Sequence, residues 1–230
     1  WKFPAGFIQI QINRGKYASG SSFMNEYGVV MAANFCASRE NRLSVSEGGI
    51  GHYLMKIVIK KARTAREAVA MAGGLISKYG FTDSGMNYAI ADASEGWFLH
   101  VVKGRRWIAR RIPDNEVAVI SNRFTIDKVD LKSEKEYMGS KDIISYAKNR
   151  GWLKKRAKKF NFAKTYGAKK SQESMGNILR QWRATNLLSR HKYQIEDQLP
   201  FSFIPRRVVK VTDLFEVLRD HYEGTEYDLT

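Results

Sequence analysis

Residues 86–112, MNYAIADASEGWFLHVVKGRRWIARRI, contain the pattern that decides the fold. Three short apolar runs, at 86–92, 96–102 and 106–112, are separated by turn-forming residues at 93–95 and by Gly104. Short strands that follow one another across tight turns are typical of an antiparallel meander. A fourth run, EVAVIS at 116–121, is predicted to continue the meander as a further strand.

The flanking segments add strands and helices in separate groups. GFIQIQIN (6–13) alternates isoleucine with glutamine, which predicts a strand with one buried face, and the wholly apolar GVVMAANF (28–35) predicts a central strand. Helical patterns cover 51–62, 64–80, 134–149, 171–189 and 211–221. In the second of these, Thr64 and Glu67 have the spacing of a capping box, and Gly80 can end the helix. Segregated strands and helices indicate an α+β fold.

The composition limits the classes of protein that the sequence can encode. With 230 residues, 43% of them hydrophobic, the chain can build one globular core, so we expect a single domain over residues 1–230. One cysteine excludes an internal disulfide, and no run approaches the roughly 18 apolar residues of a membrane span. The four histidines are scattered without zinc-ligand spacing, so no metal or cofactor is predicted. HYEGTEYD (221–228) resembles a cation site in composition, but an exposed polar tail is the favoured interpretation.

The net charge of +16 is unevenly distributed. Residues 148–170 hold ten lysines and arginines and no acid, together with Trp152, Phe160, Phe162 and Tyr166. One interpretation is a surface for nucleic acid or another polyanion, on which the rings stack. The favoured one is a solvated face whose rings pack inward, because charge runs usually mark solvated surface. We expect a basic helical insertion at about 131–170.

Cys36 and two asparagines are the residues of most chemical interest. Cys36 follows the apolar strand 28–35 with no histidine near it in sequence, which favours a buried, inert thiol over a nucleophile. Asn34 ends the same strand, and Asn122 follows the run 116–121. Asparagines at strand ends are commonly turn formers, but their amides can also stabilise negative charge in acyl transfer. The sequence does not show whether these two meet.

Several segments in order carry a resemblance to a known family. They are MNEYGVVMAANF, EGGIG before a helix, TAREAV, YAIADASEGWFLHVVKGRRWIARRIPD, VAVISNRFTID, PFSFIP and RDHYEGTEYDLT. Together they resemble the cysteine dipeptidases related to dipeptidase A, and more distantly the bile-salt hydrolases and penicillin acylases of the N-terminal-nucleophile class. The resemblance implies a four-layer αββα sandwich, with two antiparallel sheets between helices, that is incomplete in this chain.

The resemblance also implies a reaction and its residues. The family hydrolyses the amide bond of dipeptides with a cysteine that becomes residue one after processing, and the free α-amine acts as its base, without metal or cofactor. That cysteine lies upstream of the strand before Cys36, so we expect a central fragment, inactive alone, whose nucleophile is absent. Asn34 matches the oxyanion-hole asparagine, and Asn122 matches the asparagine that holds the nucleophile's amine and the substrate. An arginine expected near the C-terminal end has no assigned match.

Two alternatives stay open. The same fold can serve an amidase or acyltransferase that acts on a non-peptide amide. A non-catalytic module would instead bind nucleic acid or an anionic surface through residues 148–170, although nucleic acid is not the favoured partner. Homo-oligomer formation and a cytoplasmic or exported location are also undecided by the sequence.

Overall fold

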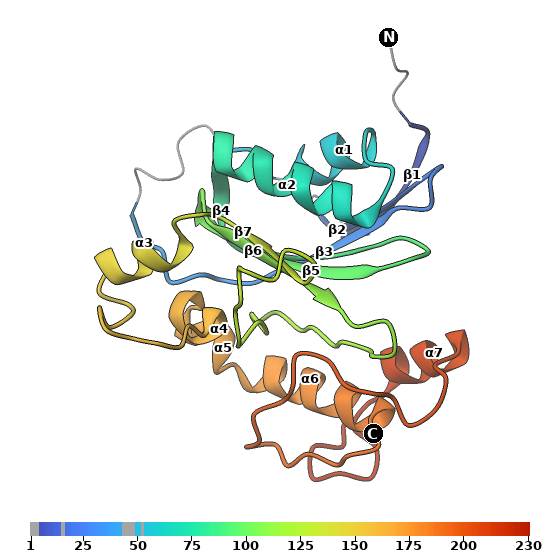
Figure 1. Cartoon of the computed structure of the whole chain (residues 1–230). Helices are drawn as coiled ribbons and strands as arrows, with labels where there is room; N and C mark the ends of the chain where they lie inside the picture. Colours follow the sequence, from blue (N-terminus) through green and yellow to red (C-terminus); the bar gives the residue numbers. More distant parts are fainter. Residues whose placement is uncertain (1–4, 15–16, 43–48, 52) are drawn as a thin grey trace.

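The computed structural model describes residues 5–14, 17–42, 49–51 and 53–230, and one antiparallel sheet forms its centre (Figure 1). The sheet has seven strands in this part of the chain, and each pairs with the next in sequence order. They are β1 (Phe7–Arg14), β2 (Tyr17–Asn25), β3 (Val30–Phe35), β4 (Phe81–Ala91), β5 (Gly96–Gly104), β6 (Trp107–Ile112) and β7 (Tyr137–Gly139). The predicted α+β class, with an antiparallel meander through residues 86–112, is therefore confirmed.

Helices lie on both sides of this sheet (Figure 1). They are α1 (Tyr53–Ile59), α2 (Ala65–Tyr79), α3 (Ile143–Asn149), α4 (Phe162–Tyr166), α5 (Lys169–Gln172), α6 (Met175–Leu188) and α7 (Val211–Arg219). The predicted ends of α2 are confirmed. Thr64 is its N-cap and accepts a hydrogen bond from the Glu67 amide at 3.1 Å, and Gly80 follows its last turn with a φ of 80°, which suits glycine. Among the described helices, none combines the length and apolar character needed to cross a membrane.

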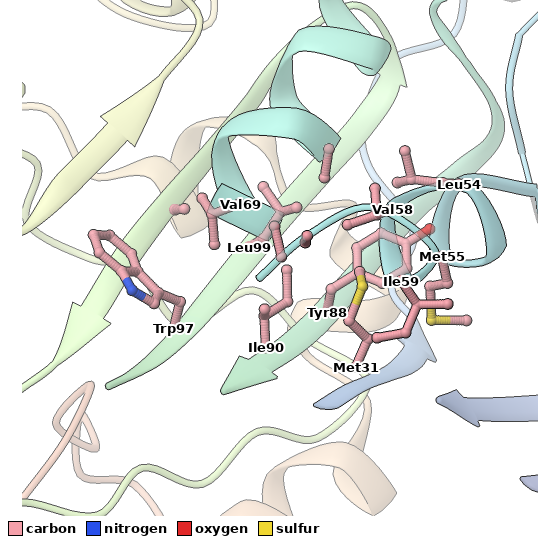
Figure 2. Packing of buried hydrophobic residues seen from close by; sticks show 14 of the residues in the cluster. Met31, Leu54, Met55, Val58, Ile59, Val69, Tyr88, Ile90, Trp97 and Leu99 are labelled. Atoms are coloured by element: carbon pink, nitrogen blue, oxygen red, sulfur yellow. The ribbon is translucent and has the colours of Figure 1, made fainter. Parts of the chain in front are cut away.

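The first face of the sheet packs against α1 and α2 (Figure 2). Leu54 and Val58 of α1 and Val69 of α2 are fully buried, and they meet Tyr88 and Leu99 from the strands. Side chains alternate between the two faces of a strand, so this core takes every second residue of β4 and β5. The remaining residues of those strands point to the second face.

The second face is covered over β4, β5 and β6 by residues from the C-terminal half of the chain. Its buried cluster joins Phe98 and Ile108 of the sheet to Phe160, Phe162 and Tyr166 of the basic stretch. Three of the four rings in the charge run therefore pack inward, which confirms the favoured interpretation of that run. Its basic side chains surround a hydrophobic element that helps to build the core.

Over β1, β2 and β3 the second face is bare among the described residues. Ile8, Ile10, Met24 and Val30 are 69%, 68%, 50% and 38% exposed. The strand register pairs Ile8 with Met24 and Met24 with Val30, so these side chains form one apolar surface. We call these four residues the bare face. The strand predicted at 6–13 is confirmed. The prediction that its isoleucines are buried is wrong for Ile8 and Ile10 in this structure, and the side chain of Ile12 lies outside what the structure describes.

Two further predictions are corrected. Residues 116–121 do not form a strand. Val117 makes only an isolated bridge to Phe203, because β7 pairs with the edge of β6 that a further strand would have needed. The helix predicted at 134–149 is confirmed only in its second half, as α3, since its first half contributes β7.

Candidate functional site

Three polar side chains form a row across the second face of the sheet. Asn34 on β3 is the register partner of Asn87 on β4, and Asn87 is the partner of His100 on β5. Residues opposite each other in a sheet point to the same side, so the three side chains lie in line. We call them the polar row. It begins beside the bare face and ends in the covered core.

The polar row holds one irregular segment, residues 121–126. The Asn34 amide donates to the Ser121 carbonyl at 2.7 Å, and the Asn87 amide donates to the carbonyls of Ser121 at 3.2 Å and Arg123 at 3.1 Å. His100 Nε2 accepts a hydrogen bond from the backbone amide of Thr125 at 3.1 Å. Strand geometry therefore fixes the backbone on both sides of Asn122 and Arg123, although the segment belongs to no strand itself.

Asn122 lies at the centre of a second set of hydrogen bonds. Its amide donates to the Phe35 carbonyl at 2.6 Å, and its Oδ1 accepts from Arg180 Nη2 at 3.0 Å. Arg180 also donates to Asn177 Oδ1 at 2.6 Å, and the Asn177 amide donates to the Asn122 carbonyl at 3.1 Å. The start of α6 is thus joined to the end of β3 through Asn122.

The structure therefore brings together the two asparagines singled out in the sequence. Asn34 bonds to residue 121 and Asn122 bonds to residue 35, so the two strand-end segments exchange hydrogen bonds. Each side-chain amide nitrogen carries two hydrogens, and each of the two nitrogens donates one hydrogen bond to a backbone carbonyl. Each side chain is therefore held in place by the backbone of the other segment.

Sequence reasoning missed Asn87 and Arg180. Asn87 is fully buried, and the only signal was a polar residue within the apolar run MNYAIAD. Arg180 is on the helix predicted at 171–189, but nothing in that pattern indicated contact with Asn122. Its contact with the predicted site is the hydrogen bond to Asn122 Oδ1.

Cys36 is unsuited to act as a nucleophile. Its side chain is fully buried in the second core, and desolvation raises the pKa of its thiol to about 12. At neutral pH the group is a neutral thiol without access to solvent, whereas nucleophilic attack requires a thiolate. The favoured interpretation of Cys36 as a packing residue is confirmed.

Several polar atoms around the segment have no partner. Asn87 Oδ1, Ser121 Oγ and Arg123 Nε are buried without a hydrogen bond in the described part of the chain. Desolvation also lowers the pKa of Arg123, which means that its charge is held at a cost. Buried polar groups are normally satisfied, so their concentration here marks a place with unused binding capacity.

Possible metal ligands are not grouped in the same way. Among residues 5–14, 17–42, 49–51 and 53–230, no three histidine, cysteine or acidic side chains gather closely enough to hold an ion. In the C-terminal HYEGTEYD segment, His221 faces Glu223 at 3.7 Å, and Arg183 binds the nearby Asp220 at 2.7 Å. An arginine thus neutralises the carboxylate that precedes this segment.

Comparison with known proteins identifies the family. Residues 10–230 match Peptidase family C69, and the chain belongs to this family. It is 29% identical to the "Probable dipeptidase" of Latilactobacillus sakei over 213 residues, which cover 89% of this chain and 44% of that protein. It is 32% identical to the "Probable dipeptidase B" of Lactococcus lactis subsp. lactis (strain IL1403) over 187 residues, or 79% and 39% of the two proteins.

A further relative and one solved structure complete the comparison. The "Dipeptidase" of Bifidobacterium longum (strain NCC 2705) is 30% identical over 200 residues, covering 79% of this chain and 37% of that protein. The chain thus spans less than half the length of each of these three relatives. A penicillin V acylase from Agrobacterium tumefaciens aligns with 48% of this chain and 43% of its own at 14% identity, with a TM-score of 0.31, which is too low to carry an argument.

Proposed function

We propose that this chain is the asparagine-bearing part of an N-terminal-nucleophile cysteine dipeptidase whose nucleophile lies upstream of Trp1. The observation that supports this most is the meeting of Asn34 and Asn122 through hydrogen bonds between two strand-end segments. The burial of Cys36 supports the proposal, because it argues against Cys36 itself as the nucleophile. The names of the relatives add support, since all three are called dipeptidases.

In this proposal the α-amine of the N-terminal cysteine takes the thiol proton while the sulfur attacks the carbonyl carbon of the peptide bond. The second hydrogen of the Asn34 amide stabilises the oxyanion, and Asn122 holds the α-amine and the substrate. The carbon–nitrogen bond then breaks, and the proton passes to the leaving amino group. Water hydrolyses the thioester, which releases the first amino acid and restores the thiol.

We assign a positioning role to Arg180. Its guanidinium donates to Asn122 Oδ1 and thereby fixes which end of the side-chain amide points at the Phe35 carbonyl. A charge-assisted donor of this kind holds an amide more firmly than a neutral one. Arg180 would act through Asn122 and need not touch the substrate.

The proposal extends to the fold. A four-layer αββα sandwich needs a second sheet against the face opposite α1 and α2, and the exposed Ile8, Ile10, Met24 and Val30 suit such a contact. Residues 1–230 would then be one incomplete hydrolase domain, with 131–170 as its basic insertion. The polar row borders the bare face, so a nucleophile on the second sheet would approach Asn34 from that side.

Asn122→Ala in the complete polypeptide tests the proposed site. Loss of one such amide typically costs about 10²–10³ in rate, so kcat for dipeptide hydrolysis should fall by that factor while the protein stays folded. Asn115→Ala, at an exposed loop position, is the matched control and should keep wild-type kcat. Unchanged kcat in Asn122→Ala would remove Asn122 from the catalytic site.

Two further measurements separate the alternatives. N-terminal sequencing of the mature protein should find a cysteine at position one, and a mature terminus at Trp1 would rule out the proposed mechanism. Assays with dipeptides and with acyl amides in parallel should show hydrolysis of the dipeptides. A clear preference for acyl amides would favour the amidase or acyltransferase instead.

A further inference from the structure

A cavity of about 830 Å³ lies on the Arg123 side of the 121–126 segment. Arg123, Phe124 and Thr125 line one part of it, and Arg39, Trp152 and Lys164 are among the residues that line the rest. Neither Asn34 nor Asn122 is in the lining, so the cavity is distinct from the asparagine contacts described above. Its volume falls in the range of small-molecule sites and far exceeds the space taken by a simple inorganic ion.

The charges in the cavity are unbalanced. Of its lining acids, Asp127 pairs with Arg110 at 3.6 Å and Glu173 pairs with Lys169 at 3.6 Å. By contrast, Arg39, Arg123 and Lys164 form no ion pair with any described residue, and Asp197 is the one lining acid left to offset them. The cavity therefore presents excess positive charge to whatever enters it.

Arg123 differs from the other partly buried arginines. Arg106, Arg150 and Arg183 each contact a carboxylate, at 2.6, 2.5 and 2.7 Å. Arg123 has no such partner in the described chain, and its Nε is buried without a hydrogen bond. Because Asn87 fixes the Arg123 carbonyl and the Arg123 amide donates to Ser121, the side chain extends from a rigid backbone. An unpaired charge on a partly buried side chain carries a desolvation cost, which an anion bound from outside would offset.

We infer that this cavity binds the α-carboxylate of a short peptide or amino acid, with Arg123 as its principal contact. A guanidinium matches a carboxylate with two parallel hydrogen bonds, and Trp152 and Leu199 offer apolar surface to the rest of the ligand. A dipeptide substrate and an amino-acid product both carry an α-carboxylate, so either of them could be the ligand of this cavity. The choice of a peptide ligand rests on the proposed function, whereas the anion site itself rests on the cavity.

Calorimetric titration of the 230-residue chain tests the inference without requiring hydrolysis. The probes are alanyl-alanine, its C-terminal amide and free alanine. A charge-assisted contact is worth about 1.5–3 kcal/mol, so the amide should bind about 10–100-fold more weakly than the dipeptide. If the dipeptide binds more tightly than alanine, the natural ligand of the cavity is the substrate. If alanine binds more tightly, the natural ligand is the product.

Arg123→Met should weaken binding of the favoured carboxylate probe by about the same factor and leave the amide unchanged. Arg123→Lys keeps the charge but loses the paired donors, so its loss should be intermediate. Arg105→Met removes an exposed arginine outside the cavity and serves as the control for net charge. Equal binding of dipeptide and amide, no binding of any probe, or wild-type affinity in Arg123→Met would overturn the inference. Carboxylate binding that persists while Asn122→Ala keeps full kcat would contradict only the catalytic proposal.

Discussion

The two halves of the second sheet face differ in what covers them. Over β4, β5 and β6, aromatic side chains from the basic stretch close a core that contains the fully buried Phe162 and His100. Over β1, β2 and β3, Ile8 and Ile10 of β1 lie open to solvent. Both halves have comparable apolar patterns in sequence, so the difference depends on which partner segment reaches them. The polar row crosses the boundary, and the candidate site lies where covered and bare surface meet.

The largest expected effect is in the covered half. Phe162 is fully buried between the rings of His100 and Tyr166, with ring centroids 5.9 and 5.0 Å away. Phe162→Ala should lower the free energy of unfolding by about 3–5 kcal/mol, because it removes buried apolar surface and leaves a cavity. Urea denaturation followed by circular dichroism measures this. A loss below about 1 kcal/mol would mean that the covered half is not a true core.

The next effect is pH-dependent and also belongs to the covered half. Burial lowers the pKa of His100 from its ordinary 6.5 to about 3. Between pH 6.5 and pH 3, His100 is protonated in the unfolded chain but not in the folded chain. His100 therefore lowers the free energy of unfolding by about 1.4 kcal/mol for each pH unit as the pH falls towards 3. Above pH 6.5 His100 is neutral in both states, so its contribution to the free energy of unfolding is fully present. Urea titrations between pH 7 and 5 should show this slope.

His100→Gln should remove that slope, because a glutamine oxygen can still accept the Thr125 amide without taking up a proton. His191→Gln is the control, since His191 is exposed and its loss should leave the wild-type slope. Identical slopes in wild type and His100→Gln would show that His100 does not carry the pH dependence.

The smallest expected effect is in the bare half. Ile8 is 69% exposed, so Ile8→Ala in the 230-residue chain should change the free energy of unfolding by no more than about 0.5 kcal/mol. In the complete polypeptide, a second sheet over this face would raise the cost to about 2–5 kcal/mol. The comparison of the same substitution at both chain lengths is the measurement. A small effect at both lengths would argue against the second sheet.

Much of the sheet could be predicted because its signals are local. The meander from Met86 to Ile112 alternates apolar strands with turn residues, and α2 has its cap at Thr64 and its stop at Gly80. The run 116–121 looked equally strand-like, but a strand also needs a free edge to pair with, and β7 occupies that edge. Edge availability is not encoded in the segment itself.

The candidate site was predicted in part for the same reason. Asn34 and Asn122 could be singled out because each follows an apolar run, but neither position specifies a partner 87 residues away. Asn87 and Arg180 were missed because a single polar residue in a strand or helix pattern carries no sign of what it contacts. Asn87 joins the site as a buried side chain that bonds to residues 121 and 123, and the exposed Arg180 joins it through its hydrogen bond to Asn122.

The sequence by itself determined the α+β class, the antiparallel order of the central strands, the buried packing role of Cys36 and the segments by which the chain resembles its family. These follow from periodicity, turn chemistry and short motifs, which act over a few residues. Only the tertiary structure decided that the polar row holds residues 121–126, that Arg180 reaches Asn122, and that Arg123 faces a cavity with no ionic partner among the described residues. Those are contacts between residues far apart in the chain, and they depend on how the sheet and helices pack.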